Sequence, residues 1–330
     1  MTAYGNMRGV NYIPSYAHDT IDIWRMFNRD IVDRELGFAE DMGFNCTRIF
    51  INYHGYKKSK KDMLRAIGMF VDLCEKHNLK CILIPFDSFC VDLYDRSKDI
   101  AYATSFLQNC LFPVEDMKTF ESYWRRFLSY PQSPGYTMLD PKYWDQLKTY
   151  LSDLIEPYRK DSRILAWDIM NEPWAFPIMD QERIMEFVEH MCHFSKKIAS
   201  STPITLGLSS WSETPKVEKI VDLISFHIWR IDEYDKVLSS AKKYEDETGK
   251  PVLLTEFGSN FFFKPPYVTD SEQLRFYKKF FPKIVKSGIG WLIWEFIVGS
   301  DAWAHCGIVY PNGHKRPAGK FLLEYLKEIN

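Results

Sequence analysis

The sequence predicts a single α/β domain folded as a (β/α)₈ barrel, and three observations lead to this prediction. Short apolar runs, typical of buried strands, recur eight times along the 330 residues. Amphipathic segments of helical periodicity separate many of these runs, as a parallel sheet with helical connections requires. No Pro/Gly/Ser-rich linker or shift in composition divides the chain, so residues 1–330 are expected to form one domain.

The eight candidate strands share a short, mostly apolar composition. They are residues 9–13, 45–51, 80–86, 164–170, 203–208, 223–227, 251–257 and 288–296.

The helical segments share apolar residues at intervals of three and four. They are residues 31–42, 63–77, 143–158, 182–200, 232–248 and 271–286. Gly43, directly after the first of them, is expected to be its C′ glycine. An open doubly wound sheet is the alternative fold, but the chain lacks both the GxGxxG and the GxxxxGK[ST] phosphate-binding patterns.

Composition argues against several classes of function. The chain carries 42 Lys and Arg against 44 Asp and Glu, so no strong field favours nucleic acid or an anionic membrane. No apolar run reaches membrane-spanning length. Seven scattered cysteines without CxxC spacing indicate neither a zinc nor a redox site and favour a reducing compartment. Because the N-terminus also lacks a signal-peptide pattern, we expect a cytoplasmic protein, unless a signal peptide precedes this sequence.

One connection is unusually long. Residues 87–141 follow the third strand and are rich in Tyr, Phe and Trp, and the whole chain contains ten Trp and 19 Tyr. Sugar-binding clefts use such rings as flat apolar platforms. A long loop at the carboxyl end of a barrel strand would border the active site, whereas a satellite subdomain that only packs is the alternative.

Two glutamates stand at the carboxyl ends of predicted strands. Glu172 follows the fourth strand within the sequence Asn-Glu-Pro, and Glu256 lies in the seventh within Thr-Glu-Phe-Gly. These strands face each other across a barrel of eight, so both carboxylates can reach one reacting centre. Retaining glycoside hydrolysis needs such a pair, about 5–5.5 Å apart. Asn171, beside Glu172, can hydrogen-bond the sugar 2-hydroxyl.

These motifs resemble clan A glycoside hydrolases, and specifically the cellulase-like glycoside hydrolase family 5. The resemblance covers the whole chain and implies a retaining glycosidase with Glu172 as the acid/base and Glu256 as the nucleophile. It further implies that Arg48 contacts the nucleophile, that His227 lies near the reacting centre and that Trp294 floors the −1 sugar site. Because two carboxylates suffice for this chemistry, no metal or cofactor is expected.

Two positions depart from the family pattern. Trp229 stands where a tyrosine usually donates to the nucleophile, and it offers only an indole N–H. Asp87 stands where a histidine usually ends the third strand, which suggests a different contact with the −1 sugar. We therefore expect the substrate, rather than the class of reaction, to differ from that of an endoglucanase.

Three functions compete on this sequence. The favoured one is a retaining hydrolase of β-glycosidic bonds in an oligo- or polysaccharide, with exo action on short oligosaccharides or glycoconjugates as the alternative to endo action. A non-catalytic carbohydrate-binding barrel would not require both glutamates. A metal-dependent hydrolase would want His/Asp clusters such as HxH on the first strand, which has Asn11 and Tyr12 instead. The expected partner is thus a carbohydrate, with neither nucleic acid nor membrane.

Overall fold

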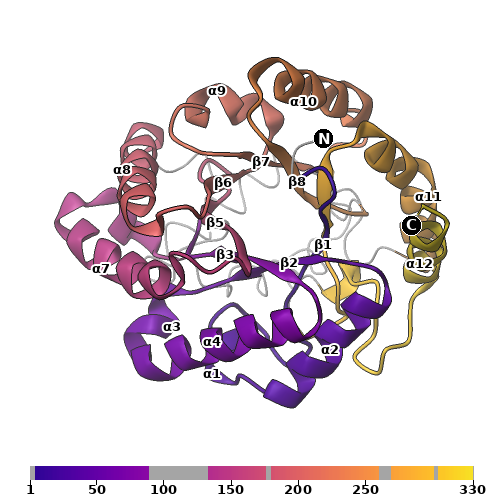
Figure 1. The fold of residues 1–330 in the computed structure, drawn as a ribbon, viewed down its shortest axis with the longest axis horizontal. Helices are drawn as coiled ribbons and strands as arrows, with labels where there is room; N and C mark the ends of the chain where they lie inside the picture. The colour runs from indigo at the N-terminus through magenta and orange to yellow at the C-terminus, as the bar shows by residue number, and fades with distance from the viewer. Residues whose placement is uncertain (1–3, 89–132, 176–179, 260–268, 301–303, 330) are drawn as a thin grey trace, which may run out of the picture.

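The computed structural model describes residues 4–88, 133–175, 180–259, 269–300 and 304–329, in which parallel strands form a ring enclosed by helices (Figure 1). The strands are β1 (Arg8–Asn11), β2 (Cys46–Phe50), β3 (Lys80–Ile84), β4 (Phe86–Asp87), β5 (Ile164–Asn171), β6 (Ile204–Leu208), β7 (Ile224–Ile228), β8 (Val252–Phe257) and β9 (Gly290–Ile293). The ring closes because β1 pairs with both β2 and β9, and β3 pairs with β5. Closure confirms the predicted barrel and excludes the open sheet.

Pro85 interrupts the third barrel strand. A proline has no backbone N–H to donate to a ladder, so β3 ends at Ile84 and β4 resumes at Phe86. The nine strands therefore occupy eight positions in the ring. β4 continues along β5 and places Asp87 directly opposite Asn171.

Helices cover the outside of the ring (Figure 1). The predicted helices correspond to α2 (Arg29–Asp41), α4 (Lys60–Lys76), α7 (Trp144–Ile155), α8 (Gln181–Ala199), α10 (Tyr234–Thr248) and α11 (Asp270–Ser287). Four further described helices were not predicted: α1 (Asp22–Arg25), α3 (Tyr53–Lys58), α9 (Thr214–Val217) and α12 (Pro317–Ile329). Among all the described helices, none is both long and apolar enough to cross a bilayer.

Local signals set several helix ends. The Asn28 side chain accepts a hydrogen bond at the start of α2, and Gly43 follows that helix with φ of +83°, as expected of a C′ glycine. At α11, Thr269 and Glu272 form a reciprocal capping box, and Gly288 ends the helix in the left-handed region. These caps fix where the chain turns back toward the barrel.

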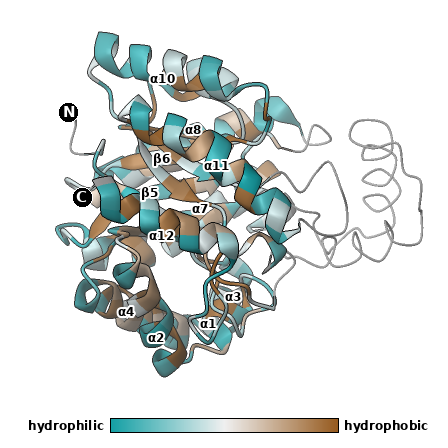
Figure 2. Cartoon of the chain, turned by 90° about the vertical axis from the view of Figure 1, so that its right-hand side faces the viewer, coloured by the Kyte–Doolittle hydropathy of each residue, from teal (hydrophilic) through white to brown (hydrophobic). Residues whose placement is uncertain are grey.

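Buried apolar side chains form one large cluster that includes residues of both strands and helices. Figure 2 shows hydrophilic residues mainly on the outer helices. A smaller apolar cluster fills one end of the barrel interior and comprises Cys46, Ile82, Ala166, Leu223, Leu253 and Leu292. Successive residues of a strand alternate between its faces, so residues two positions further on enter the same interior. Those positions include the buried polar residues Arg48, Asp168, Ser225 and Thr255. The interior therefore becomes polar toward the carboxyl ends of the strands.

The first residue of the predicted insertion over residues 87–141 pairs with a residue within it. Asp87 and Ser133 form an antiparallel bridge, with hydrogen bonds of 2.6 and 3.0 Å between their backbones. The intervening residues 89–132 lie outside the described part of the chain.

Candidate active site

Arg48 lies at the centre of the polar end of the barrel. The side chain is fully buried, and its Nε donates to Asp168 Oδ2 at 2.9 Å. Its Nη1 lies 2.9 Å from Asn11 Oδ1 and 2.5 Å from Glu256 Oε1, and its Nη2 lies 2.7 Å from Asn171 Oδ1. A guanidinium presents its donors in a rigid plane. One side chain thus fixes the relative positions of residues from β1, β5 and β8.

Gly207 in β6 makes room for this arrangement. A Cβ atom at this position would lie 2.6 Å from Arg48 Nη2 and 3.0 Å from Asp168 Oδ2. The Gly207 N–H also donates to Asp168 Oδ1 at 2.7 Å. Each oxygen of the Asp168 carboxylate is therefore satisfied, and the close approach of the guanidinium requires glycine.

Register shifts aim additional side chains into the site. The pairing of β5 with β6 shifts between Asp168 and Asn171, and that of β7 with β8 shifts just before His227. In a regular strand, residues three positions apart point to opposite faces. The shift lets Asp168 and Asn171 both reach Arg48, as irregularities beside active sites commonly do. The other shift places His227 opposite Glu256.

Glu172, His227 and Glu256 lie together at this end of the barrel. His227 Nδ1 is 2.7 Å from Glu172 Oε1, and Nε2 is 3.4 Å from Glu256 Oε1. One ligand atom from each of these buried residues falls within 4.8 Å of the others. The structure thus brings together the two glutamates that are far apart in sequence, with an imidazole in contact with both.

Glu172 has a backbone conformation that is uncommon for a residue with a side chain. Its φ is +45°, in the left-handed region, where a residue other than glycine costs about 1–3 kcal/mol. Its N–H donates to Gly207 O at 2.7 Å, and its carbonyl accepts from Ser88 Oγ. Hydrogen bonds on both sides therefore hold this backbone in place.

The pKa of Glu172 is raised to about 8, mainly by burial and in addition by the nearby carboxylate of Glu213. A hydrogen bond with Trp229 and the positive charge of Arg48 oppose this rise. Glu172 is therefore a carboxyl group that keeps its proton at neutral pH, as a general acid must.

Burial also raises the pKa of Glu256, to about 7, although His227 and Arg48 lower it. The Arg48 guanidinium lowers the pKa of Glu256, as the sequence predicts, but burial raises that pKa by more. For His227, burial lowers the pKa to about 4, so the imidazole is neutral across the range in which the two carboxyl groups titrate. The neighbouring charges thus act differently on the two groups, because Glu213 favours the protonated form of Glu172, whereas His227 and Arg48 favour the ionised form of Glu256.

The remaining predicted residues surround this pair. Asp87 Oδ1 accepts from Asn171 Nδ2 at 3.1 Å. Trp229 hydrogen-bonds Glu172, whereas the tyrosine usual at this position serves the nucleophile. Trp294 follows β9 and is 6% exposed. Its backbone N–H donates at 2.8 Å to the backbone oxygen of Phe257, the residue that follows Glu256.

Five residues of the site were not predicted: Asn11, Ser88, Asp168, Gly207 and Glu213. A signal existed for Asp168, which is a charged residue inside an otherwise apolar strand. Glu213 lies beyond β6 in a short 3₁₀ turn, where its carboxylate accepts from Ser209 Oγ at 3.1 Å. Its proximity to Glu172 depends on how that turn folds back over the barrel, which no local pattern encodes.

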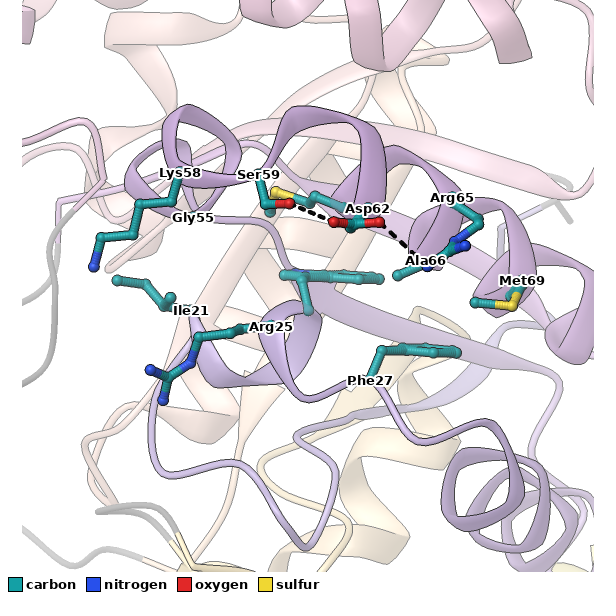
Figure 3. Close-up of a pocket in the computed structure, with 12 residues that line it drawn as sticks. Ile21, Arg25, Phe27, Gly55, Lys58, Ser59, Asp62, Arg65, Ala66 and Met69 are labelled. Atoms are coloured by element: carbon teal, nitrogen blue, oxygen red, sulfur yellow. Dashed lines mark hydrogen bonds and ion pairs between the residues drawn. The ribbon is translucent and has the colours of Figure 1, made fainter.

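A separate pocket of about 470 Å³ lies between α1, α3 and α4 (Figure 3). Ile21, Phe27 and Met69 supply part of its apolar lining, and Arg25 and Lys58 lie at its edge. None of its lining residues belongs to the glutamate site. The glutamate site is therefore the better candidate for catalysis.

Comparison with known proteins identifies a family whose model matches most of the sequence. Residues 24–300 match the model of "Cellulase (glycosyl hydrolase family 5)". The chain is 25% identical over 225 residues to "Mannan endo-1,4-beta-mannosidase 2" of Arabidopsis thaliana, a match that covers 53% of this chain and 52% of the relative. The alignment thus spans about half the length of that curated relative.

Solved structures share the fold at low sequence identity. A variant of GH5_18 from Streptomyces cattleya in complex with Manβ1-4GlcNAc superposes with a TM-score of 0.69 at 14% identity, over 98% of this chain and 80% of the other. The "Exo-beta-1,4-mannosidase Op5Man5" from Opitutaceae bacterium strain TAV5 gives 0.67 at 14% identity, over 97% and 59%.

Gly207→Ala is predicted to destabilise the protein, because the new methyl group overlaps the buried Arg48 and Asp168 side chains. Overpacking of this kind costs about 1–3 kcal/mol of unfolding free energy. Urea denaturation followed by circular dichroism measures the loss. Gly68→Ala in α4 is the matched control, since its Cβ would meet only Tyr158 Oη at 3.5 Å. Equal stabilities of the two variants would contradict the proposed packing.

Proposed function

This chain belongs to glycosyl hydrolase family 5, and we propose that it cleaves β-glycosidic bonds with retention of configuration, using Glu172 as acid/base and Glu256 as nucleophile. The observation that carries the proposal is the buried cluster of two glutamates and His227, with one ligand atom of each within 4.8 Å of the others. That separation suits direct attack on the sugar by one carboxylate, because inverting enzymes need about 6.5–9.5 Å to admit a water.

A neutral His227 allows two arrangements of protons in this cluster, with the shared proton on either Glu172 or Glu256. A neutral imidazole carries one N–H, and His227 has a carboxylate oxygen near each nitrogen. With Glu172 protonated, its O–H donates to Nδ1, and the N–H at Nε2 faces the ionised Glu256. The surrounding charges favour this arrangement, because Glu213 raises the pKa of Glu172, whereas His227 and Arg48 lower that of Glu256.

In the first step, an oxygen of Glu256 forms a bond to the anomeric carbon while the bond to the departing oxygen breaks. Glu172 gives its proton to that oxygen, so the leaving group departs as an alcohol. The product is a glycosyl ester on Glu256 and a carboxylate at Glu172.

In the second step, Glu172 takes a proton from water, and the water oxygen replaces Glu256 at the anomeric carbon. Two displacements on the same carbon retain its configuration. Arg48 stabilises Glu256 as the leaving carboxylate, since its guanidinium lies 2.5 Å from Oε1. Asn171 and Trp294 are assigned to the −1 sugar, on the 2-hydroxyl and as the floor respectively.

β-Mannosides are the first substrates to test. The curated relative is a mannan endo-1,4-β-mannosidase, and one structural neighbour is an exo-β-1,4-mannosidase. Those names cover both endo and exo action. A non-catalytic carbohydrate-binding barrel is the second function, but it offers no reason for the buried pair of carboxyl groups or for the left-handed backbone at Glu172.

Glu256→Ala and Glu172→Ala are predicted to lose activity in different ways. Without the nucleophile, turnover should fall on every glycoside. Without the acid/base, activated aryl glycosides should retain more activity than mannan, because their leaving groups need little protonation. Azide should partly rescue Glu172→Ala by attacking the glycosyl ester, giving a β-glycosyl azide. Initial rates on para-nitrophenyl β-mannoside and on mannan measure both effects.

Near-normal activity of both variants would refute the assignment. Two carboxylates and an imidazole can also bind a metal ion, so the same assays should follow dialysis against EDTA. The double displacement requires no metal, and the rate is expected to stay unchanged. A large loss that added Zn²⁺ or Mn²⁺ reverses would favour a metallohydrolase instead.

The pH–rate profile is predicted to respond to the charges around the pair. Activity falls below the pKa of Glu256, because the nucleophile becomes protonated, and falls above that of Glu172, because the acid loses its proton. Removing the negative charge in Glu213→Gln lowers the pKa of Glu172, so the alkaline limb should move to lower pH. Removing the cation in Arg48→Met raises the pKa of Glu256, so the acid limb should move to higher pH.

Arg48→Lys is the matched control for the acid limb, because it keeps the positive charge. Circular dichroism should confirm that each variant is folded. A profile in which Glu213→Gln leaves the alkaline limb in place would show that Glu213 does not tune the acid.

A further inference from the structure

The side-chain amide of Asn171 has only one orientation that its neighbours allow. Arg48 Nη2 lies 2.7 Å from one end of the amide, and a guanidinium can only donate, so that end is the oxygen Oδ1. The other end is therefore Nδ2, which donates to Asp87 Oδ1 at 3.1 Å. Asn171 is thus held between a donor and an acceptor.

The Asp87 carboxylate is itself held in place by the strand. β4 pairs with β5 in a register that puts residues 87 and 171 directly opposite each other. The Asp87 backbone also bridges to Ser133, whose Oγ accepts from the Tyr53 N–H at 2.9 Å. Asp87 is 5% exposed and its contact with Asn171 is buried, so water competes little for the hydrogen bond.

The Asn171 amide therefore has one remaining N–H hydrogen, fixed in direction by the two contacts. An amide nitrogen carries two hydrogens, and Asp87 takes one of them. The second lies in the same plane and points away from Asp87. In the proposed function this hydrogen meets the 2-hydroxyl of the −1 sugar.

We propose that Asp87 is a positioning residue that orients the Asn171 amide. The amide then recognises the hydroxyl group at carbon 2 of the −1 sugar. The proposal rests on the proposed function and deepens it. The sequence suggested that Asp87 contacts the sugar directly. Here Asp87 instead orients the Asn171 amide through a hydrogen bond. Carbon 2 is also where mannose and glucose differ, so the aim of this N–H bears directly on the choice between them.

A double-mutant cycle on three substrates tests the proposal. The variants are Asp87→Ala, Asn171→Ala and the double variant, with Asp87→Asn as the conservative rescue, because an asparagine oxygen can still accept from Nδ2. The substrates are the para-nitrophenyl β-glycosides of mannose, of glucose and of the 2-deoxy sugar that corresponds to both. The measured quantity is kcat/KM, with thermal melting as the check of folding.

Asp87→Ala is expected to lose about 10-fold or more on the better 2-hydroxy substrate, as expected for a misaligned polar partner. It should lose little on the 2-deoxy sugar or in the Asn171→Ala background, and Asp87→Asn should recover most of the activity. A loss that persists on the 2-deoxy sugar, a loss that adds to that of Asn171→Ala, or no loss at all would overturn the proposal. Wild-type inactivity on both 2-hydroxy glycosides and on mannan would instead reject the proposed function, and the inference with it.

Discussion

The buried guanidinium of Arg48 is the constraint on which the rest of the site depends. Removing a charge from water costs several kcal/mol, and the barrel offsets this cost with two carboxylates, Asp168 and Glu256, and with two amide oxygens. The four partners enter from three strands of the ring, β1, β5 and β8. Gly207 and the register shift in β5 follow from the same requirement, because the first leaves space for the guanidinium and the second turns Asn171 toward it. Taking the arginine away would leave buried carboxylates without compensation, which is far more costly than losing an exposed ion pair.

The burial that holds Arg48 and its partners in place also changes the pKa values of the two glutamates. Both glutamates have raised pKa values because each lies out of water, and the surrounding groups then separate them. Arg48 and His227 act mainly on Glu256, whereas Glu213 acts on Glu172. His227 stays neutral and contacts both carboxylates, so its single N–H can serve only one of them at a time. The substitution of Trp229 for the usual tyrosine fits this division, since its hydrogen bond goes to Glu172 and leaves Arg48 and His227 to stabilise the ionised Glu256.

Periodicity alone predicted the eight barrel strands and six of the helices, because alternation and amphipathic spacing follow from which faces are buried. The position of the two glutamates at the ends of the fourth and seventh strands was likewise readable, since a barrel of eight brings those ends together. The hydrogen-bond network around Arg48 could not be predicted from the sequence. It depends on departures from regular pairing, namely the break at Pro85 and the shifts near Asn171 and His227, and a strictly alternating strand would point Asp168 and Asn171 to opposite faces. The contact of Asp87 with the sugar stays a prediction, whereas its hydrogen bond to Asn171 depends on the register of β4 against β5, which no local pattern encodes.

Glu256 is proposed to become covalently bonded to the sugar, and trapping that ester tests its role most directly. A 2-deoxy-2-fluoro β-mannosyl or β-glucosyl donor with a good leaving group slows both steps, and the slower hydrolysis of the ester lets it accumulate. Intact mass spectrometry should then show one added fluoroglycosyl group, and peptide mapping should place it on Glu256. A label on Glu172 or on any other residue, or the absence of a label from a protein that hydrolyses the parent glycoside, would contradict the account.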